Sequence, residues 1–516
     1  MNGMAPAATA TKDMDPRSGL KRGQPKGSWS DDIKIEETPS KKSKSSPTQP
    51  QRTGLATPSS PQLTDASAPS DDLASLLYSP QVTAKIWGIA QQGFNSPNPP
   101  TLFPEYTKPG GTKYVYRELD FWTSGFFPGS LYLLLERQQK YSHRLRTLLS
   151  SAGASADQQD PEPHLLQLEF ACKWWTETLH TNALLTNTHD LGFMICPWAR
   201  PAWDLRRDAR AYETTLTAAR SLYSRYDAKV GSLRSWDVCI TKRYSFLTPD
   251  DGILVIIDNM MNLDLLFWAA AQLGDAAMHA AAVQHARTTR KHHVRADSST
   301  CHVVVFEPDT GAFRARITNQ GHADGSAWTR GQAWAIAGFA QTYGWTREVE
   351  FLDTAVACAE YFLAELPVSR VPPWDFRAPG EGPQPTDTSA AVIAAYGLLL
   401  IHEAFVALGK ESGYLEHALS IVRAVTSKHT TGPSAYRRAN RKIQTVEQGE
   451  VTETVGIEVD MGAECETILG GATINNYEFA PRRWANHGLV YADYYFLLFG
   501  NKLLEMGLDV KLMGGV

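Results

Sequence analysis

The chain has 516 residues, a formal net charge of -5 and a hydrophobic fraction of 43%. That fraction is typical of a globular protein with a sizeable core, and the length allows one very large domain or several ordinary ones. The mild acidic balance is spread along the chain, which argues against electrostatic binding of nucleic acid by the main body.

The cysteines and the first residues indicate where the protein works. Six cysteines are scattered without a CxxC pair, and the chain opens without the basic-then-apolar pattern of a secretory signal. The longest apolar stretches are interrupted by charge or glycine, so we expect no membrane span. These features predict a reduced, cytoplasmic protein with buried thiols.

The first segment differs from the rest in composition. Residues 1–75 are rich in Ser, Pro, Thr, Lys and Gln and poor in apolar side chains. Such a segment buries too little surface to offset its ordering entropy, so we expect a disordered tail followed by one ordered domain over 76–516. The basic cluster at 41–44 could be a nuclear-import signal, but a solvated patch is the stronger interpretation.

Beyond the tail, apolar residues recur mainly at i, i+3, i+4 and i+7, which predicts amphipathic helices. The clearest examples cover 131–149, 165–184, 209–226, 259–273, 329–343, 350–366, 388–408 and 413–425. Strand patterns are few and short, at 253–257, 301–306 and 313–317, with a hairpin turn at 308–311 between the last two. Aromatic and glycine-rich loops are expected at 121–129, 192–203 and 367–386.

This series of helical patterns with few strand patterns predicts an all-α protein with short β segments in its loops. Two architectures fit a long series of helices: an α-solenoid, or a closed (α/α)6 toroid of six inner and six outer helices. A solenoid should show a sequence period, and none is present. Acids and tryptophans near helix starts, with loops of uneven length, favour the (α/α)6 six-hairpin toroid with a central cleft.

Asp258 is the first candidate functional residue. It follows the apolar run 253–257 and opens a helical pattern. It could simply cap that helix, but the run delivers the carboxylate from a buried segment rather than from a solvated loop. Asn259 and Asn262 could bond the carboxylate or a sugar hydroxyl. Burial disfavours the charged form of an acid and suits it to proton transfer near neutral pH.

Asp190 is the second candidate, and it carries the same ambiguity. It could be a helix cap or a partner for the adjacent His189. Two such acids, each followed by Met and bulky apolar residues, make a joint functional reading better than two independent caps. Paired carboxylates near tryptophans are typical of sugar chemistry, in which an acid donates a proton and aromatic faces hold the ring.

The segment 320–334 supplies groups that could bind such a ligand. Arg330 is suited to gripping a carboxylate with two parallel hydrogen bonds. Trp328 and Trp334 could stack on sugar rings. The alternative places one tryptophan in the core and Arg330 on the surface.

Metal and nucleotide chemistry find little support in the sequence. His302 lies in an expected strand, where a lone histidine is more often structural. His292 and His293 are near it, but no HExxH or Cys/His ligand spacing is present, so we expect no metal site. The sequence also lacks a G-x-S-x-G elbow, a Walker loop and a dinucleotide fingerprint, and we expect no cofactor.

Taken together, the motifs resemble those of the unsaturated glucuronyl hydrolases of glycoside hydrolase family 88. The matching segments occur in family order over about residues 80 to 500; they are 121–129, 189–194, 234–237, 257–263, 326–334, 374–376, 387–390 and 491–496. Each segment is weak alone, but the ordered set is specific. The tail lies outside the resemblance.

The resemblance implies an (α/α)6 toroid that acts without a metal on oligosaccharides produced by polysaccharide lyases. These end in a 4,5-unsaturated uronic acid. Water is added across the C4=C5 bond, and the resulting hemiketal opens and releases the neighbouring sugar. By the same resemblance, Asp258 is the general acid and base and Asp190 supports it. The residues that line the site are then Trp122, His302, Gln320, Trp328, Arg330 and Trp334, with Arg330 our choice for the uronate carboxylate.

Two alternatives remain open at this point. A rhamnogalacturonyl hydrolase would share the toroid and the hydration chemistry but take a pectin-derived substrate; 259–262 and 328–330 resemble the glucuronyl family more closely. A sugar-binding toroid without catalysis would need to keep neither Asp190 nor Asp258. The segments 151–163 and 426–452 resemble insertions, and either would alter the preferred substrate length if it covered the cleft.

Overall fold

The computed structural model describes residues 73–151, 162–380, 382–444, 451–461 and 465–509. The chain divides into two units, 1–58 and 59–516, and every described residue belongs to the second. Most of the expected tail, with its basic cluster at 41–44, therefore lies outside the described residues. The described part begins with a helix, α1 (Leu73–Tyr78), three residues before the boundary expected from composition.

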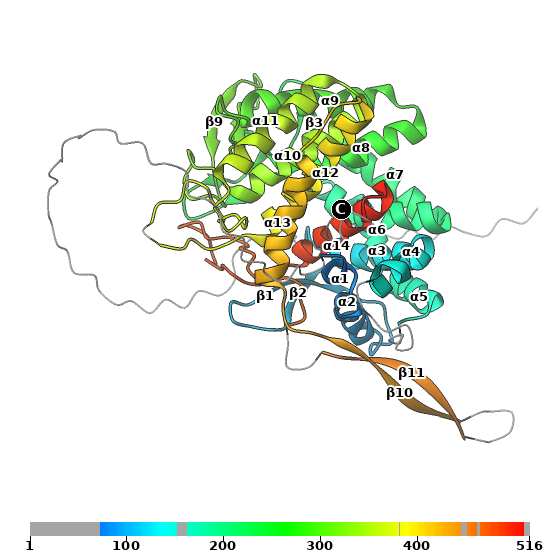
Figure 1. Ribbon diagram of the computed structural model, residues 1–516. Coiled ribbons are helices and arrows are strands. Elements are labelled where there is room, and N and C mark those ends of the chain that lie inside the picture. Colours follow the sequence, from blue (N-terminus) through cyan, green and yellow to red (C-terminus); the bar gives the residue numbers. More distant parts are fainter. Residues whose placement is uncertain (1–72, 152–161, 381, 445–450, 462–464, 510–516) are drawn as a thin grey trace, which may run out of the picture. The chain divides into compact units, whose positions relative to one another are not determined.

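Six helices contact one another in chain order, and the last contacts the first (Figure 1). We call them the inner helices. They are α3 (Phe126–Lys140), α6 (Leu191–Arg206), α8 (Asn259–Leu273), α10 (Thr329–Thr346), α12 (Thr388–Ala407) and α14 (Val490–Met506). Their side chains are buried on nearly all faces, as in α10, where every residue from Thr329 to Ala340 is buried. Helices buried all round are apolar all round, which explains their weak amphipathic pattern.

A second set of helices packs outside the first. Each inner helix from α3 to α12 contacts an outer helix that follows it in the chain. The outer partners are α5 (Leu165–Thr176), α7 (Ala209–Tyr223), α9 (Ala276–His293), α11 (Val349–Glu365) and α13 (Tyr414–His429). The remaining helical segments are α2 (Pro80–Gly93), α4 (Ser142–Ser151), η1 (Leu179–Leu184) and η2 (Pro249–Asp251). Helices alternate between the two sets along the described chain, so the connections run between neighbours.

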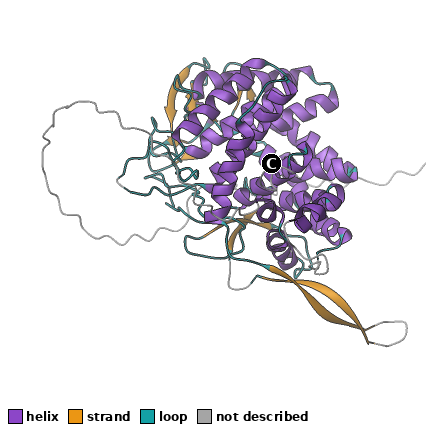
Figure 2. Ribbon diagram, in the orientation of Figure 1, coloured by secondary structure: helices purple, strands orange, loops and turns teal. Residues whose placement is uncertain are grey.

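Most strands are short and lie in the connections; the exceptions are β10 (Ala435–Gln444) and β11 (Val451–Asp460), which form a long hairpin (Figure 2). The three strands expected from the sequence are present and form one antiparallel sheet in the order β7 (Ile253–Ile256), β8 (Val303–Phe306), β9 (Phe313–Ile317). The others pair locally; they are β1 (Leu102–Thr107) with β2 (Tyr114–Glu118), β3 (Tyr226–Asp227) with β4 (Ser232–Leu233), and β5 (Cys239–Ile240) with β6 (Ser245–Phe246). The prediction of a mainly helical fold is therefore confirmed, and the expectation of short β segments holds for every described strand except β10 and β11.

The segment 192–203, expected to be a loop, is the body of α6, so that prediction was wrong. The misleading signal came from Pro197 and Pro201 inside the helix. Pro197 has no N–H for the carbonyl of Phe193, four residues earlier. Gly125 packs so tightly against this turn that a Cβ there would lie 2.3 Å from that carbonyl oxygen. Packing of α3 on α6 thus accommodates prolines that local propensity disfavours.

Two expected helices are each divided in the structure. The pattern over 131–149 covers the end of α3 and α4, which are separated at Tyr141, and that over 165–184 covers α5 and η1. The segment 426–452 includes the end of α13 and most of a hairpin of β10 (Ala435–Gln444) and β11 (Val451–Asp460). This hairpin packs against α2, where Gln91 Nε2 donates to the Ile457 carbonyl. Of the other expected insertion, 152–161 lie outside the described residues.

Among the described helices, α12 alone meets the length and hydropathy expected of a membrane span, with 20 residues and a mean hydropathy of 1.9. Two thirds of its apolar window is buried inside the fold, where it packs between α10, α13 and α14. Its composition is that of a core helix.

Candidate active site

The residues singled out in the sequence gather where inner helices begin. Asp190, Asp258 and Trp328 occupy the position just before the first turns of α6, α8 and α10. Trp122 lies three residues before Gly125, which holds the same position at α3. Because these helices contact one another in chain order, their starts bring side chains distant in sequence to one end of the fold.

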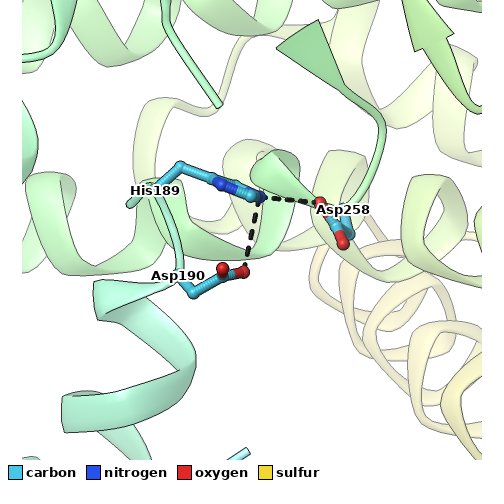
Figure 3. Close-up of side chains that lie close together, drawn as sticks. All are labelled: His189, Asp190 and Asp258. Atoms are coloured by element: carbon cyan, nitrogen blue, oxygen red, sulfur yellow. Dashed lines mark hydrogen bonds and ion pairs between the residues drawn. The ribbon is translucent and has the colours of Figure 1, made fainter. Parts of the chain in front are cut away.

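His189 joins the two candidate carboxylates (Figure 3). Its Nε2 lies 3.1 Å from Asp258 Oδ1 and 3.4 Å from Asp190 Oδ1. The imidazole is fully buried, whereas the side chains of Asp190 and Asp258 keep 12% and 15% of their surface exposed. Both carboxylates are therefore open to a ligand while their common partner is not.

The hydrogen bonds of His189 restrict where its protons can be. Nδ1 lies 3.0 Å from the carbonyl oxygen of Ser235, which can only accept, so Nδ1 carries a proton. Nε2 then either donates to an ionised Asp258 or accepts the proton of a neutral Asp258. In both cases the pair holds one shared proton along the 3.1 Å contact.

The surroundings move the pKa values of both partners. Burial raises the pKa of Asp258 above its ordinary value, and the hydrogen bond from His189 opposes that rise. Burial alone would lower the pKa of His189, but the carboxylates of Asp190 and Asp258 raise it above its ordinary value of 6.5. A carboxyl that holds its proton near neutral pH suits a general acid.

The capping interpretation is wrong for both acids. Asp190 and Asp258 stand at cap positions, but neither side chain accepts a hydrogen bond from the first turn of its helix. Asp190 is oriented instead by Thr188, whose hydroxyl donates to Oδ2 at 2.8 Å. The alternative that Asp190 is a partner for His189 is confirmed by their contact.

Strand β7 explains how the chain delivers Asp258. The strand is wholly buried, and it pairs with β8 in antiparallel register. The Ile257 amide donates to the His302 carbonyl at 3.0 Å, which extends the ladder to the residue before Asp258. Asn259 and Asn262 bond backbone groups of Leu233 and Phe193 rather than the carboxylate.

A second group forms beside the first. The His302 and Trp328 rings meet edge to face at 4.8 Å, and the Arg330 guanidinium lies 4.8 Å from the Trp328 ring. His302 Nδ1 accepts the Asn319 amide at 3.0 Å, which leaves the proton of a neutral ring on Nε2. Burial, reinforced by Arg330, lowers the pKa of His302 to about 3. His302 is thus a neutral donor.

Arg330 is buried, with 3% of its side chain exposed, and it forms a 2.7 Å ion pair with the fully buried Asp387. Its terminal nitrogens also donate to Gln320 Oε1 and to the carbonyls of Thr473 and Ile474. Binding of a uronate by Arg330 stays a prediction, and it would require one of these bonds to be exchanged. The alternative that Arg330 lies on the surface is wrong.

Trp122 and Trp334 differ in how far a ligand can reach their rings. Trp122 is half-buried and contacts Phe193 at 5.7 Å and Tyr491 at 5.1 Å. Trp334 is 1% exposed and packs against Phe193 at 5.2 Å. Trp122 therefore keeps a surface for a ligand, whereas Trp334 supports the aromatic layer beneath it.

Sequence reasoning missed three residues of this site. His189 joins the carboxylates. Trp236 lies between His189 and His302, with ring separations of 6.2 and 6.1 Å. Tyr491 links Trp122 to Arg330, whose guanidinium is 5.4 Å from its ring. All three stand in segments that carried the family resemblance, and the adjacency of His189 to Asp190 was the available signal.

His189, Asp190 and Asp258 also offer three ligand atoms within 4.8 Å of one another, a spacing that a metal ion could use. No ligand spacing in the sequence indicated this cluster, because the three residues come from two separate segments. The expectation that the protein needs no metal stays a prediction.

The chain matches no model of a known protein family. It is 33% identical to the unsaturated glucuronyl hydrolase of Bacillus sp. GL1 over 301 residues, which are 58% of this chain and 71% of that relative. It is 32% identical to the unsaturated chondroitin disaccharide hydrolase of Streptococcus agalactiae over 301 residues, 58% of this chain and 67% of that one.

Solved structures agree with these relatives. A heparin-specific unsaturated glucuronyl hydrolase superposes with a TM-score of 0.64 at 26% identity, covering 85% of this chain and 98% of its own. The Bacillus sp. GL1 enzyme gives 0.62 at 26% identity, covering 83% and 97%. Similarity of this extent in sequence and in structure places the chain in the family of unsaturated glucuronyl hydrolases.

Proposed function

We propose that this protein removes the 4,5-unsaturated uronic acid from the non-reducing end of lyase-generated oligosaccharides by hydrating its C4=C5 bond. The observation that carries the proposal is the pair of open carboxylates, Asp190 and Asp258, joined by the buried His189. Family membership supports the substrate class, since the relatives are named for unsaturated glucuronyl and chondroitin disaccharide substrates.

The inner and outer helices are best described as an (α/α)6 six-hairpin toroid. In support, the six inner helices contact one another in order and close on themselves, and five of them pack on an outer helix that follows. The candidate site lies at the N-terminal ends of the inner helices, where helix dipoles favour an anionic ligand. A uronate is such a ligand.

The reaction follows from where charge develops. Asp258 delivers its proton to C4 of the enol ether, and positive charge grows at C5 and the ring oxygen. The Asp190 carboxylate stabilises that charge, and the ionised Asp258 then takes a proton from the water that attacks C5. The hemiketal product opens and releases the neighbouring sugar. Trp122, Trp328, His302 and Gln320 would hold the sugar, and Trp334 would support Trp122 from below.

Ultraviolet absorbance of the conjugated enol-ether carboxylate tests this function directly. Unsaturated disaccharides are prepared with lyases from heparin, chondroitin, hyaluronan, gellan, xanthan and pectin. We expect purified protein to abolish the absorbance of at least one of them. Folded protein that leaves every absorbance unchanged would make the sugar-binding alternative the better one. Because we expect no metal at the cluster of His189, Asp190 and Asp258, a chelator should not slow the reaction.

Replacement of Asp258 by Asn removes the transferable proton but keeps the size of the side chain. We expect turnover to fall by about 10²- to 10⁴-fold, the usual scale for loss of a general acid–base group. The absorbance assay measures turnover, and an unchanged circular dichroism spectrum shows that the variant is folded. Together they test Asp258 as the general acid and base. Near-normal turnover would remove Asp258 from that role.

We also propose a cytoplasmic location, which the thiols support. All six cysteines are free, which fits a reducing compartment such as the cytoplasm.

A further inference from the structure

A large cavity runs along the inside of the inner helices, from the first turns of α3, α6 and α8 to the last turns of α10, α12 and α14. Its volume is about 850 Å³. All six inner helices contribute to its wall. The polar wall residues include Glu136 on α3, Asp204 on α6, Asp264 on α8, Trp345 on α10, Glu403 on α12 and Glu505 on α14.

The cavity carries a modest excess of negative charge. Five carboxylates line it, those of Glu136, Asp204, Asp264, Glu403 and Glu505, against three cationic side chains. Ion pairs offset part of this charge: Arg200 pairs with Asp264, Lys140 contacts Glu136 at 2.9 Å, and Lys502 contacts Glu403 at 2.9 Å and Glu505 at 3.2 Å. The structure shows no ion pair for Asp204 among the described residues. The carbonyl ends of the inner helices add partial negative charge at the same place. A cation is therefore favoured here and an anion is not.

The deeper wall is aromatic and includes unpartnered hydroxyl groups. Tyr494 is 8% exposed and Tyr495 3% exposed, and both line the cavity beside Tyr396. Among the described residues, no protein group hydrogen-bonds the hydroxyls of these three tyrosines. Aromatic faces attract cations, and the free hydroxyls can accept hydrogen bonds from an ammonium group. Three such side chains around one space indicate a ligand with both N–H groups and apolar carbons.

An aromatic layer separates this cavity from the candidate active site. Phe126 and Phe193 line the cavity on one side and contact Trp122 at 5.9 and 5.7 Å on the other. Trp334 packs against Tyr495 at 5.4 Å within the same layer. The rings of Phe126 and Phe193 thus lie between the cavity and Trp122 of the candidate active site.

We propose that this cavity binds an organic polycation, namely an aliphatic chain bearing two or more ammonium groups. The carboxylates at the mouth would pair with the ammonium groups, and the tyrosines would pack along the carbon chain. The volume and the aromatic wall suit such a chain better than a bare metal ion, which prefers several converging oxygen ligands.

Calorimetric titration of the full-length protein with spermidine tests the proposal. We expect saturable binding at one site, weakened by added salt as an ion-pairing ligand should be. The double variant Asp204→Asn, Glu505→Gln removes two exposed carboxylates of the mouth and should weaken binding about fivefold or more. Glu213→Gln removes an exposed carboxylate of the outer helix α7 that does not line the cavity. The Glu213→Gln variant should bind spermidine as tightly as the parent protein does.

A chain of similar length without charge separates this site from nonspecific apolar binding. The neutral 1,8-octanediol should give no saturable heat. The proposal is overturned by the absence of saturable spermidine binding, by equal losses in Glu213→Gln and the double variant, or by octanediol binding as tightly as spermidine. Turnover is not the readout, so failure here leaves the proposed reaction untouched.

Discussion

At the scale of single residues, the most consequential contact is the one between His189 and Asp258. The histidine was not among the residues expected to form the site, although it is the neighbour of Asp190. Its Nδ1 proton is fixed by the Ser235 carbonyl, so it can exchange only one proton with Asp258. The pair therefore titrates as a unit, and its behaviour belongs to neither residue alone.

Replacement of His189 by Gln should change how activity depends on pH. In the parent protein the shared proton leaves as pH rises through a value above 6.5, because the carboxylates raise the pKa of His189. In His189→Gln the proton must stay on Asp258 alone, an acid whose ordinary pKa of 3.8 is raised by burial. We expect a lower kcat and an alkaline limb moved to lower pH, measured by pH profiles of kcat.

His417→Gln, on the outer helix α13, is the control and should leave the profile unchanged. An alkaline limb that stays in place in His189→Gln would show that His189 only packs against the carboxylates. A fall in kcat without a shift would have the same meaning, since a structural defect lowers activity at every pH.

The sequence identified Asp190, Asp258 and the group around Trp328 because their local patterns are visible without the fold. It did not reveal that Arg330 is enclosed by Asp387 and two carbonyls, since these partners lie 57 to 144 residues away. It also could not distinguish the stacking face of Trp122 from the packing role of Trp334. Those differences depend on which inner helices meet, and tertiary contacts decide that.

At the scale of helices, the first turns of α6 and α8 set the distance between the two carboxylates. Gly192 lies two residues after Asp190, and Asn262 lies one turn after Asp258. A Cβ at Gly192 would be 2.5 Å from Asn262 Oδ1 and 2.7 Å from its Cα. Only a residue without a side chain permits this approach, so the glycine is a steric requirement of the site.

Gly192→Ala should therefore push α6 and α8 apart. We expect the free energy of unfolding to fall by about 1–3 kcal/mol, the usual scale for overpacking, and kcat to fall because Asp190 moves relative to Asp258. Urea unfolding and the absorbance assay measure the two effects. Unchanged stability and kcat would show that the turns can separate without harm.

Gly344→Ala, in the last turn of α10, is the matched control because nothing lies within 4 Å of a Cβ there. It should raise the free energy of unfolding by about 0.5–1 kcal/mol, since alanine loses less conformational freedom on folding. The two variants make the same chemical change, so a difference in sign isolates the contact with Asn262.

Helix prediction succeeded where an amphipathic face or an uninterrupted run marked the element, as in α8, α10 and α12. It failed at α6, where Pro197 and Pro201 outweighed the pattern, and it gave no warning of α2, α9 or the hairpin of β10 and β11. The strands β7, β8 and β9 were visible because each is a short apolar or alternating run beside a clear turn. Closure of the inner helices on one another was inferred from the lack of a repeat rather than from any local signal.

At the scale of the whole described fold, one buried acid ties distant segments together. Asp493, in the first turn of α14, accepts hydrogen bonds from the Tyr114 hydroxyl at 2.9 Å and from the amides of Ile468 and Leu469 at 2.9 Å each. Its partners come from β2 and from the loop that precedes α14. Burial raises the pKa of Asp493 from 3.8 to about 7.

This raised pKa makes stability depend on pH. Between about pH 4 and about pH 7, folded Asp493 keeps its proton while the unfolded chain has lost it, so the unfolded state binds fewer protons. The free energy of unfolding then falls as pH rises through this window, by about 4 kcal/mol for this group. About two of these three pH units lie above pH 5, so in Asp493→Asn the difference between the free energies of unfolding in urea at about pH 5 and about pH 8 should shrink by about 2–3 kcal/mol.

Asp353→Asn, on the exposed side of α11, should leave the pH dependence as it is in the parent protein. A pH dependence that persists unchanged in Asp493→Asn would assign the proton uptake to another group. An increase in the dependence would mean that Asp493 is ionised in the folded protein.

The contacts of α14 also bear on the protein's synthesis. This helix packs against α12 on one side and α3 on the other, yet it leaves the ribosome after all the other described helices. Until it emerges, the apolar flanks of α3 and α12 remain uncovered, and Tyr491 is absent from the site. Nascent chains of this protein should therefore expose a hydrophobic seam until α14 has emerged, a state that chaperones bind. Among the described helices, α14 is synthesised last, and it completes both the ring of inner helices and the candidate active site.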